Sequence, residues 1–329
     1  MTAPTARNLR FMAPTIIDYD YGISTIDVEF VRPNLAASHL IVDSGEAAFV
    51  DVGTSYSAPV LLNALATKGL AREQVRYVCV THVHLDHAGG AGELMRHLPN
   101  ATLVVHPRGE RHMVDPSKLM AGTIAVYGEE TTRRLYGDIP PIPQQRVHAV
   151  ADNEGLELGQ RTLRFLDTPG HAYHHYCVYD ESAAAVFSGD TFGISYRELD
   201  TAKGAFIFPT TTPIHFDPEA AHASIDRLLS LAPRAIYLTH FSEVTELQRL
   251  GADLHADLDA FVAIAEASGA DGEDRAVRIR TALRGYLGER LAGHGCALSD
   301  DRVDDVLNMD LQLNAQGLEV WLERREANS

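Results

Sequence analysis

The sequence predicts an α/β protein in which two halves of alternating strands and short helices precede a helical C-terminal segment. Short apolar runs that end at polar residues or glycine recur between residues 40 and 240, which is typical of buried strands. From about Thr245 onward, apolar residues recur instead at three- and four-residue intervals, which favours amphipathic helices. We therefore expect a domain of strands and helices at residues 1–245 and a helical subdomain at residues 246–329.

In the first half, two apolar runs flank Asp43-Ser44-Gly45-Glu46, a turn sequence that predicts a β-hairpin. A helix is expected at residues 59–68, where Gly69 marks its end. The remaining elements of this half are predicted to be a buried strand at 75–80, a short helix at 92–98 and a strand at 102–105.

Residues 107–145 break the alternation of strands and helices. This segment holds two methionines and two tyrosines and ends in the proline-rich run Pro140-Pro141-Ile142-Pro143. We expect helices followed by a loop, because prolines are poorly accommodated inside helices. Two interpretations stay open: the segment shapes a substrate pocket, or it is an insertion that only packs.

The second half repeats the strand pattern and then becomes helical. Strands at 176–179 and 184–187 are expected to flank the turn Asp180-Glu181-Ser182. The other elements are predicted to be a strand at 162–166, a helix at 218–231, a strand at 235–238, and C-terminal helices up to a break at 269–272, then at 277–291, 300–311 and 317–325. Ser299 is the expected N-cap of the helix that begins at Asp300.

The composition is that of an ordinary globular protein with a strongly acidic balance. Of 329 residues, 45% are hydrophobic and 22% charged, and the formal net charge is -17. Such a surface repels phosphate backbones, so we expect a small-molecule substrate and no nucleic-acid partner. Residues 1–8 do not resemble a signal peptide and no long apolar run is present, so we expect a cytoplasmic protein without membrane contact.

Three cysteines, Cys79, Cys177 and Cys296, are too few for a disulfide framework. Cys79 and Cys177 lie inside apolar runs that we interpret as strands, so their expected role is buried packing.

The densest chemical signal is the run Thr81-His82-Val83-His84-Leu85-Asp86-His87-Ala88-Gly89-Gly90, in which four potential metal ligands fall within six residues. His82 and His84 are two residues apart, so their side chains point the same way on an extended chain. The two glycines permit the backbone to turn just after His87. Imidazole and carboxylate ligands suit zinc, iron and manganese, and the spacing disfavours a mere cluster of solvated histidines.

This His-x-His-x-Asp-His pattern after a strand resembles the metallo-β-lactamase superfamily. The family pattern needs further ligands downstream, and His171, Asp190 and His240 follow in that order, each just past an apolar stretch. The resemblance covers roughly residues 15–245. It implies a four-layer αββα metallo-β-lactamase sandwich, with two mixed sheets between helical layers and the helical subdomain after it.

The resemblance also implies two metal-binding groups joined by one carboxylate: His82, His84 and His171 for the first metal, Asp86, His87 and His240 for the second, and Asp190 bridging both. Two divalent ions per chain are therefore expected, zinc first, with iron or manganese as alternatives. Such a pair lowers the pKa of a bridging water toward neutrality, and the resulting hydroxide attacks a carbonyl or phosphoryl centre.

Further roles follow from the same resemblance. Asp51 ends a strand where the family places an acidic residue, so we expect it to accept a hydrogen bond from a ligand histidine and fix its tautomer. Asp86 is given a catalytic role as the group that takes a proton when the bond breaks. For other residues near the ligands or on nearby segments, packing or structural hydrogen bonds are expected rather than catalysis: Tyr173, His174, His175, Tyr196, His215, His222 and His255.

Departures from known branches of the superfamily narrow the range of activities that we expect. Asp190 stands where the antibiotic-hydrolysing zinc β-lactamases have a cysteine, and His84 stands where flavodiiron proteins have a glutamate. Residues 191–197 lack the Gly-Arg-rich segment of glyoxalase II and the persulfide dioxygenases, which disfavours a glutathione conjugate. Tyr196 is further from Asp190 than the corresponding tyrosine of acyl-homoserine lactonases.

The leading hypothesis is a dinuclear metal-dependent hydrolase that uses a metal-bridging hydroxide on a small ester, thioester or lactone. The first alternative is an oxidoreductase that resembles a mononuclear iron persulfide dioxygenase. The second alternative is a catalytically silent metal-binding sensor. The C-terminal helices are expected to cover the site, to form a homodimer contact, or both.

Overall fold

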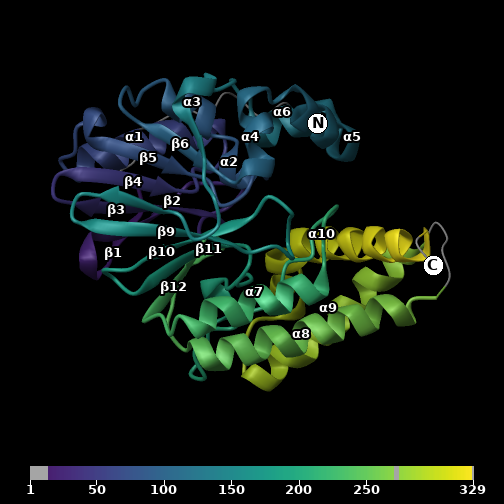
Figure 1. The fold of residues 1–329 in the computed structure, drawn as a ribbon. Coiled ribbons are helices and arrows are strands. Elements are labelled where there is room, and N and C mark those ends of the chain that lie inside the picture. Colours follow the sequence, from purple (N-terminus) through teal and green to yellow (C-terminus); the bar gives the residue numbers. More distant parts are fainter. Residues whose placement is uncertain (1–13, 270–273, 328–329) are drawn as a thin grey trace, which may run out of the picture.

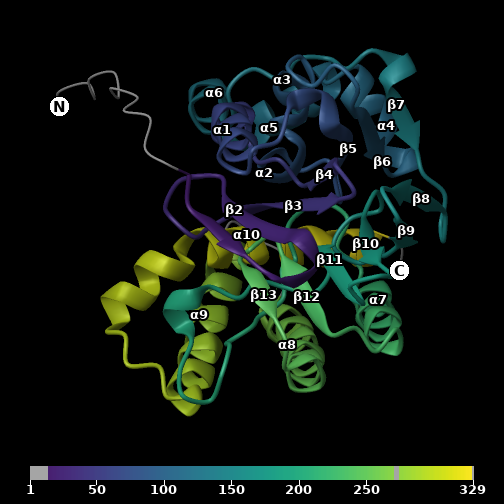
Figure 2. The same cartoon turned by 90° about the vertical axis from the view of Figure 1, so that its left-hand side faces the viewer.

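The computed structural model describes residues 14–269 and 274–327 of the chain. Two β-sheets lie face to face in the middle of the molecule, and helices cover the outer face of each sheet (Figure 1). The view turned by 90° shows α1 and α3 above the first sheet and α7 and α8 below the second (Figure 2). The predicted four-layer αββα architecture is therefore confirmed.

The first sheet has seven strands in sequence order, antiparallel from β1 to β4 and parallel from β4 to β7. Its strands are β1 (Ile16–Asp18), β2 (Ile23–Asp27), β3 (Ala37–Asp43), β4 (Glu46–Val50), β5 (Val75–Cys79), β6 (Thr102–Val105) and β7 (Val147–Ala149). The second sheet has the order β13-β12-β11-β10-β9-β8, in which only β11 and β12 pair in parallel. Its strands are β8 (Gly155–Leu158), β9 (Arg161–Asp167), β10 (Tyr176–Asp180), β11 (Ala185–Gly189), β12 (Ala235–Leu238) and β13 (Ser242–Val244).

The described helices lie outside the two sheets or after them. Their bounds are α1 (Ala58–Thr67), α2 (Leu85–Ala88), α3 (Ala91–Met95), α4 (Pro107–Val114), α5 (Ser117–Tyr127), α6 (Glu129–Tyr136), α7 (Pro218–Ser230), α8 (Leu247–Ala267), α9 (Arg275–His294) and α10 (Asp300–Ala327). None of these helices combines the length and apolar character needed to cross a membrane.

Alternation along the strands builds two cores. In β3, Ile41 belongs to the core between the sheets, whereas its neighbour Leu40 belongs to the core beneath the helices. In β11, Phe187 and Val186 divide in the same way, because successive side chains of a strand point to opposite faces. Both faces of the central strands are therefore buried, which explains why these strands appear in the sequence as continuous apolar runs.

Most elements agree with the sequence analysis, but the last helix does not. The prediction of separate helices at 300–311 and 317–325 is wrong, because α10 runs unbroken from Asp300 to Ala327. Gly317, the expected start of the second of these helices, lies inside α10 and lets the helix approach the backbone of Thr211, whose carbonyl oxygen a side chain at this position would overlap. Part of the expected break at 269–272, and residues 1–8, lie outside the described residues.

Candidate metal centre

The residues that the metal motif singled out all lie just beyond strand ends. His82 follows β5, Asp190 follows β11 and His240 follows β12, while Asp51 follows β4 and His171 lies four residues after β9. Because β4 runs parallel to β5 and β11 runs parallel to β12, the carboxyl ends of these strands meet at one edge of the sandwich. Loops at such an edge combine a rigid scaffold with accessible side chains.

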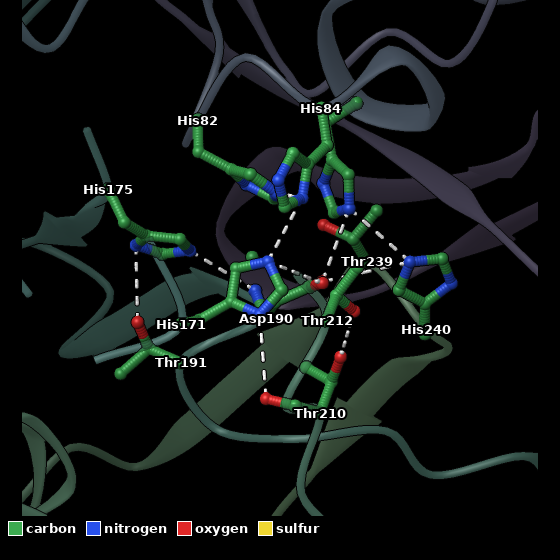
Figure 3. Close-up of polar contacts among 12 residues, drawn as sticks. His82, His84, His171, His175, Asp190, Thr191, Thr210, Thr212, Thr239 and His240 are labelled. Atoms are coloured by element: carbon green, nitrogen blue, oxygen red, sulfur yellow. Dashed lines mark hydrogen bonds and ion pairs between the residues drawn. The ribbon is translucent and has the colours of Figure 1, made fainter. Parts of the chain in front are cut away.

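Three imidazoles converge in a first group of potential ligands. The Nδ1 atom of His84 lies 2.8 Å from His82 Nε2 and 3.0 Å from His171 Nε2 (Figure 3). Nitrogens bound to one tetrahedral zinc ion would lie about 3.3 Å apart, since each zinc–nitrogen bond is about 2.05 Å long. The spacing of these three nitrogens is close to that of a shared metal ion, and with Asp190 they form a group suited to hold one.

A second group forms beside the first. His87 Nε2 lies 3.3 Å from His240 Nε2, and Asp86 Oδ2 lies 3.8 Å and 3.4 Å from these two nitrogens. These three side chains also form a group that could hold a metal ion. The structure thus brings together all seven residues of the predicted ligand set.

Asp190 stands between the two groups and turns one oxygen toward each. Its Oδ1 lies 3.2 Å from His87 Nε2 and 3.6 Å from His240 Nε2, whereas its Oδ2 lies 3.4 Å from His171 Nε2. Oδ1 is buried and has no well-formed hydrogen bond within the protein. A buried carboxylate oxygen without such a bond fits a site in which a cation completes its surroundings.

Burial and charge set the protonation of this cluster. Burial lowers the pKa of His82 well below its ordinary value and that of His84 to about 3, so both rings are neutral at physiological pH. Burial acts to raise the pKa of Asp190, but the imidazoles of His87 and His171 outweigh it and hold that pKa well below its usual range. Neutral imidazoles and an ionised carboxylate are the forms that bind metals.

His87 behaves differently from His82 and His84. Burial acts to lower its pKa, yet the carboxylates of Asp190 and Asp51 outweigh burial and raise the pKa well above its ordinary value. Without a metal ion, His87 therefore carries a proton, which a bound cation would replace.

Asp51 organises the floor of the site. It is fully buried, and its Oδ2 accepts hydrogen bonds from His87 Nδ1 at 2.7 Å and from Thr239 Oγ1 at 2.6 Å. The backbone N–H of Thr81 donates to Oδ1 at 2.8 Å. Because Nδ1 of His87 donates to Asp51, its Nε2 is left to face Asp190 and His240.

Backbone carbonyls orient two further imidazoles. His240 Nδ1 donates to the carbonyl oxygen of Leu35 at 2.7 Å. His171 Nδ1 faces the carbonyl oxygen of Thr210 at the longer distance of 3.5 Å. In both rings, Nε2 is the nitrogen that points into the site (Figure 3).

His175 holds the backbone of Asp190 rather than joining the ligands. Its Nε2 accepts a hydrogen bond from the Asp190 backbone N–H at 3.2 Å, and its Nδ1 lies 3.0 Å from Thr168 Oγ1. Gly189 precedes Asp190 with a φ of +49°, and a Cβ there would approach His175 Nε2 to 2.7 Å. The structural hydrogen bond expected of His175 is thus present, and Gly189 permits it.

The C-terminal helix α10 supports the wall beside His171. Asn314 Oδ1 accepts from the backbone N–H of Thr211 at 2.6 Å, and Asn314 Nδ2 donates to the carbonyl oxygen of Pro209 at 3.3 Å. These bonds hold the loop whose Thr210 carbonyl faces His171. On the other side of that loop, α8 helps to enclose a void of about 10 Å³ behind His171 and Asp190.

Helix α10 also contributes a buried acid that no sequence motif singled out. The hydroxyl of Tyr196 donates to Asp310 Oδ1 at 3.2 Å, and the guanidinium of Arg32 lies 4.4 Å from the centre of the Tyr196 ring. Burial raises the pKa of Asp310 to about 6. The residues around Asp310 in the sequence carry no signal of such a role, so only the fold reveals its position.

Comparison with known proteins shows a family match over most of the folded core. Residues 31–240 match the family model described as the metallo-beta-lactamase superfamily. The metallo-beta-lactamase fold-containing protein ST1585 of Sulfurisphaera tokodaii is 26% identical over 224 residues, which cover 67% of this chain and 77% of that protein. A hydroxyacylglutathione hydrolase of Maricaulis maris is 29% identical over 235 residues, which cover 70% of this chain and 72% of that protein.

More distant similarities agree with this match. The thioesterase pkgB of Emericella nidulans is 25% identical, but the match covers only 55% of this chain and 45% of that protein. Among solved structures, ST1585 from Sulfolobus tokodaii has a TM-score of 0.63 at 21% identity, with 91% of this chain and 99% of that chain covered. The metallo-beta-lactamase family protein TTHA1429 from Thermus thermophilus has a TM-score of 0.61 at 22% identity, with 96% and 93% covered. Both structures share the fold.

Proposed function

Because this chain belongs to the metallo-β-lactamase superfamily, we propose that it is a dinuclear metal-dependent hydrolase of small esters, thioesters or lactones. The observation that carries the proposal is the position of Asp190, which turns Oδ1 toward one ligand group and Oδ2 toward the other. A carboxylate placed in this way suits two cations held side by side. A single-metal centre would leave one of the two groups without a function.

In this proposal each residue has a defined task. His82, His84 and His171 would hold the first ion, Asp86, His87 and His240 would hold the second, and Asp190 would contribute to both groups. Two bound divalent ions would supply a hydroxide near neutral pH and would stabilise the oxyanion that forms on the attacked carbonyl. Zinc is the ion that we expect first, with iron or manganese as alternatives, since nitrogen and oxygen ligands suit all three.

The chain's own groups control geometry and protons around that chemistry. Asp51 fixes the direction of His87, and His175 fixes the backbone of Asp190. Asp86 is partly exposed, unlike the buried His87, so its carboxylate is the ligand best placed to exchange a proton with the substrate. Asp86 would accept the proton of the hydroxyl that has added to the carbonyl and would pass it to the departing oxygen or sulfur as the carbonyl–heteroatom bond breaks.

The relatives support a carbonyl substrate. One relative is named a hydroxyacylglutathione hydrolase and another a thioesterase, both at identities below 30%. We therefore place thioesters first among the three substrate classes. The sequence after Asp190 lacks the Gly-Arg-rich segment that we associate with glutathione thioesters, so the leaving thiol is proposed to be a different one.

A panel of carbonyl substrates tests the proposal. Protein loaded with zinc, iron or manganese is assayed on an aryl ester, an N-acetylcysteamine thioester and a γ-lactone, beside the variant Asp190→Asn. We expect hydrolysis of at least one class and a loss of more than about 100-fold in kcat/KM in the variant. The variant Asp20→Asn, on an exposed turn, is the matched control.

Two results would contradict the proposal. One is a fully metallated wild type that hydrolyses none of the three classes. The other is an Asp190→Asn variant that keeps its metal ions and its full activity.

A further inference from the structure

The ligands of the metal centre differ in their exposure to solvent. His82 and His87 are fully buried, whereas His84 and Asp86 are partly exposed. The ring of His174 lies beside that of His84, with ring centres 5.9 Å apart. The ring of His215 follows, 5.8 Å from His174. The partly exposed ligand His84 is thus joined to the half-buried His215 by the buried ring of His174.

Tyr173, two residues after His171, contacts His215 and two arginines at the far end of this row of rings. The ring of His215 packs against the Tyr173 ring with centres 4.6 Å apart and planes inclined by 30°. Arg324 donates to the Tyr173 hydroxyl at 2.6 Å, and Arg108 donates to the Tyr173 carbonyl oxygen at 3.3 Å. We call Arg108, Tyr173, His215 and Arg324 the arginine rim.

Both guanidinium groups lie close to the same aromatic ring. Their central carbons are 5.8 Å (Arg108) and 5.7 Å (Arg324) from the centre of the Tyr173 ring. The two arginines come from segments far apart in the sequence: α4, which lies on the side of the first sheet, and α10, which lies on the side of the second (Figure 1). The rim is therefore built where the 107–145 segment and the C-terminal helices approach each other.

The two guanidinium groups of the rim donate hydrogen bonds to neutral oxygen atoms, namely those of Tyr173 and Ile214. Within the described residues, no carboxylate forms an ion pair with Arg108 or Arg324, although the chain has 45 acidic residues and a net charge of -17. The acid on α4, Glu110, accepts instead a hydrogen bond from Gln144 at 2.6 Å.

The charged neighbours of His215 also indicate a positively charged environment. Burial lowers the pKa of His215, and the further contributions come from Arg324, His171, Arg108 and His112, all of which are basic. In so acidic a chain, two guanidinium groups that form no ion pair within the described residues are suited to an anion from outside.

We propose that the arginine rim binds an anionic oxygen group of the substrate, a carboxylate or a phosphate, while the carbonyl that reacts lies at the metal centre. The proposal rests on the proposed hydrolase function and adds the class of substrate. Guanidinium groups suit this task because they are always charged and present several N–H donors to two oxygens at once. The Tyr173 hydroxyl and the His215 ring add polar contacts beside them.

Matched thioesters test the rim and locate the anion within the substrate. Hexanoyl and adipoyl thioesters of N-acetylcysteamine have the same number of acyl carbons and differ by a terminal carboxylate. The hexanoyl thioester of 4′-phosphopantetheine places a phosphate in the thiol half instead. We expect the metal-loaded wild type to prefer one anionic substrate over the neutral one by about tenfold or more in kcat/KM, with the preference weaker at high salt.

The double variant Arg108→Gln/Arg324→Gln should reduce that preference to about twofold or less, because both charge-assisted contacts are lost. Arg324→Lys keeps the charge and should retain most of the preference. Arg72→Gln is the matched control, because Arg72 precedes β5 and lies at the end of that strand opposite the metal ligands. Unfolding midpoints of all variants show whether the rim has been disturbed structurally.

Failure of the rim and failure of the hydrolase function are distinguishable. If the wild type hydrolyses one of the substrates but shows no anion preference, or if the double variant keeps the preference, the rim proposal is overturned. If the wild type hydrolyses none of the substrates, calorimetry with adipate and with 4′-phosphopantetheine decides whether the rim binds an anion. Binding that weakens about tenfold in the double variant supports the rim proposal without the hydrolase function. Equal binding by the wild type and the double variant overturns the rim proposal.

Discussion

Asp51 Oδ2 lies 2.7 Å from His87 Nδ1, and both side chains are fully buried at the floor of the metal centre. The same carboxylate also accepts from the backbone N–H and the hydroxyl of Thr81 and from the hydroxyl of Thr239. Because all of these neighbouring groups donate hydrogen bonds, a side chain that itself donates would find no acceptor among them. Asp51 therefore fixes which nitrogen of His87 faces Asp190, although Asp51 itself belongs to neither potential metal group.

Replacing this carboxylate should weaken the second metal group selectively. In Asp51→Asn, the amide N–H₂ would face donors, so we expect the affinity for the second ion to fall by about 10- to 100-fold. Competition titration with a metallochromic chelator measures both affinities. Asp20→Asn serves as the control, and an unchanged second affinity in Asp51→Asn would count against this role.

Gly317 should tolerate no side chain, because α10 touches the loop beside His171 at that position. A Cβ would overlap the Thr211 carbonyl oxygen, which is backbone and has little freedom to move. We expect Gly317→Ala to lower the free energy of unfolding by about 1–3 kcal/mol and to reduce activity, since the displaced loop carries the Thr210 carbonyl.

Gly285 in α9 is the matched control for this helix substitution. A Cβ there meets nothing within 4 Å, so Gly285→Ala should raise the free energy of unfolding by about 0.5–1 kcal/mol through its helix propensity. Chemical denaturation of both variants gives the comparison. Equal effects at the two positions would show that the contact between α10 and Thr211 does not constrain the loop.

Asp310 should make stability depend on pH in a defined direction. Its pKa is raised by burial from 3.8 to about 6, so the folded state binds this proton more tightly than the unfolded state. The contribution of Asp310 to the free energy of unfolding is therefore largest below pH 4. It falls as the pH rises toward and through 6, by up to about 3 kcal/mol.

Asp310→Asn lacks this titration. Relative to wild type, the variant should gain stability between about pH 4 and pH 7, and the gain should level off above about pH 7. Denaturation of both proteins in the presence of a chelator, at several pH values, measures the difference. Parallel stability curves for the two proteins would mean that Asp310 has an ordinary pKa in the folded chain.

The metal groups could be anticipated from the sequence because their residues follow apolar strands in a fixed order. His82, His171 and His240 each stand just beyond such a run, and strand ends bring them to one edge of the fold. Local patterns could not identify Asp310 or Arg324, because both lie on a helix whose charged residues look like any solvated face until the tertiary contacts are known.

Other sequence predictions failed for local reasons. The gap expected between Leu311 and Gly317 is absent, and close packing of α10 against Thr211 explains the glycine at position 317. Strand β2 is missing from the predicted elements, since its serine, threonine and aspartate obscure a segment that is buried throughout. The three-residue strands β1, β7 and β13 are too short to show any period. The expected boundary near residue 245 and the cytoplasmic location stay predictions.

The central claim is that two metal ions act together, and metal content per chain tests it most directly. Inductively coupled plasma mass spectrometry is applied to protein purified without added metal, with Asp190→Asn purified in parallel. We predict close to two ions per wild-type chain, zinc or a mixture with iron or manganese, and a clear loss in the variant. One iron per chain and little else would contradict the account and favour the mononuclear dioxygenase alternative.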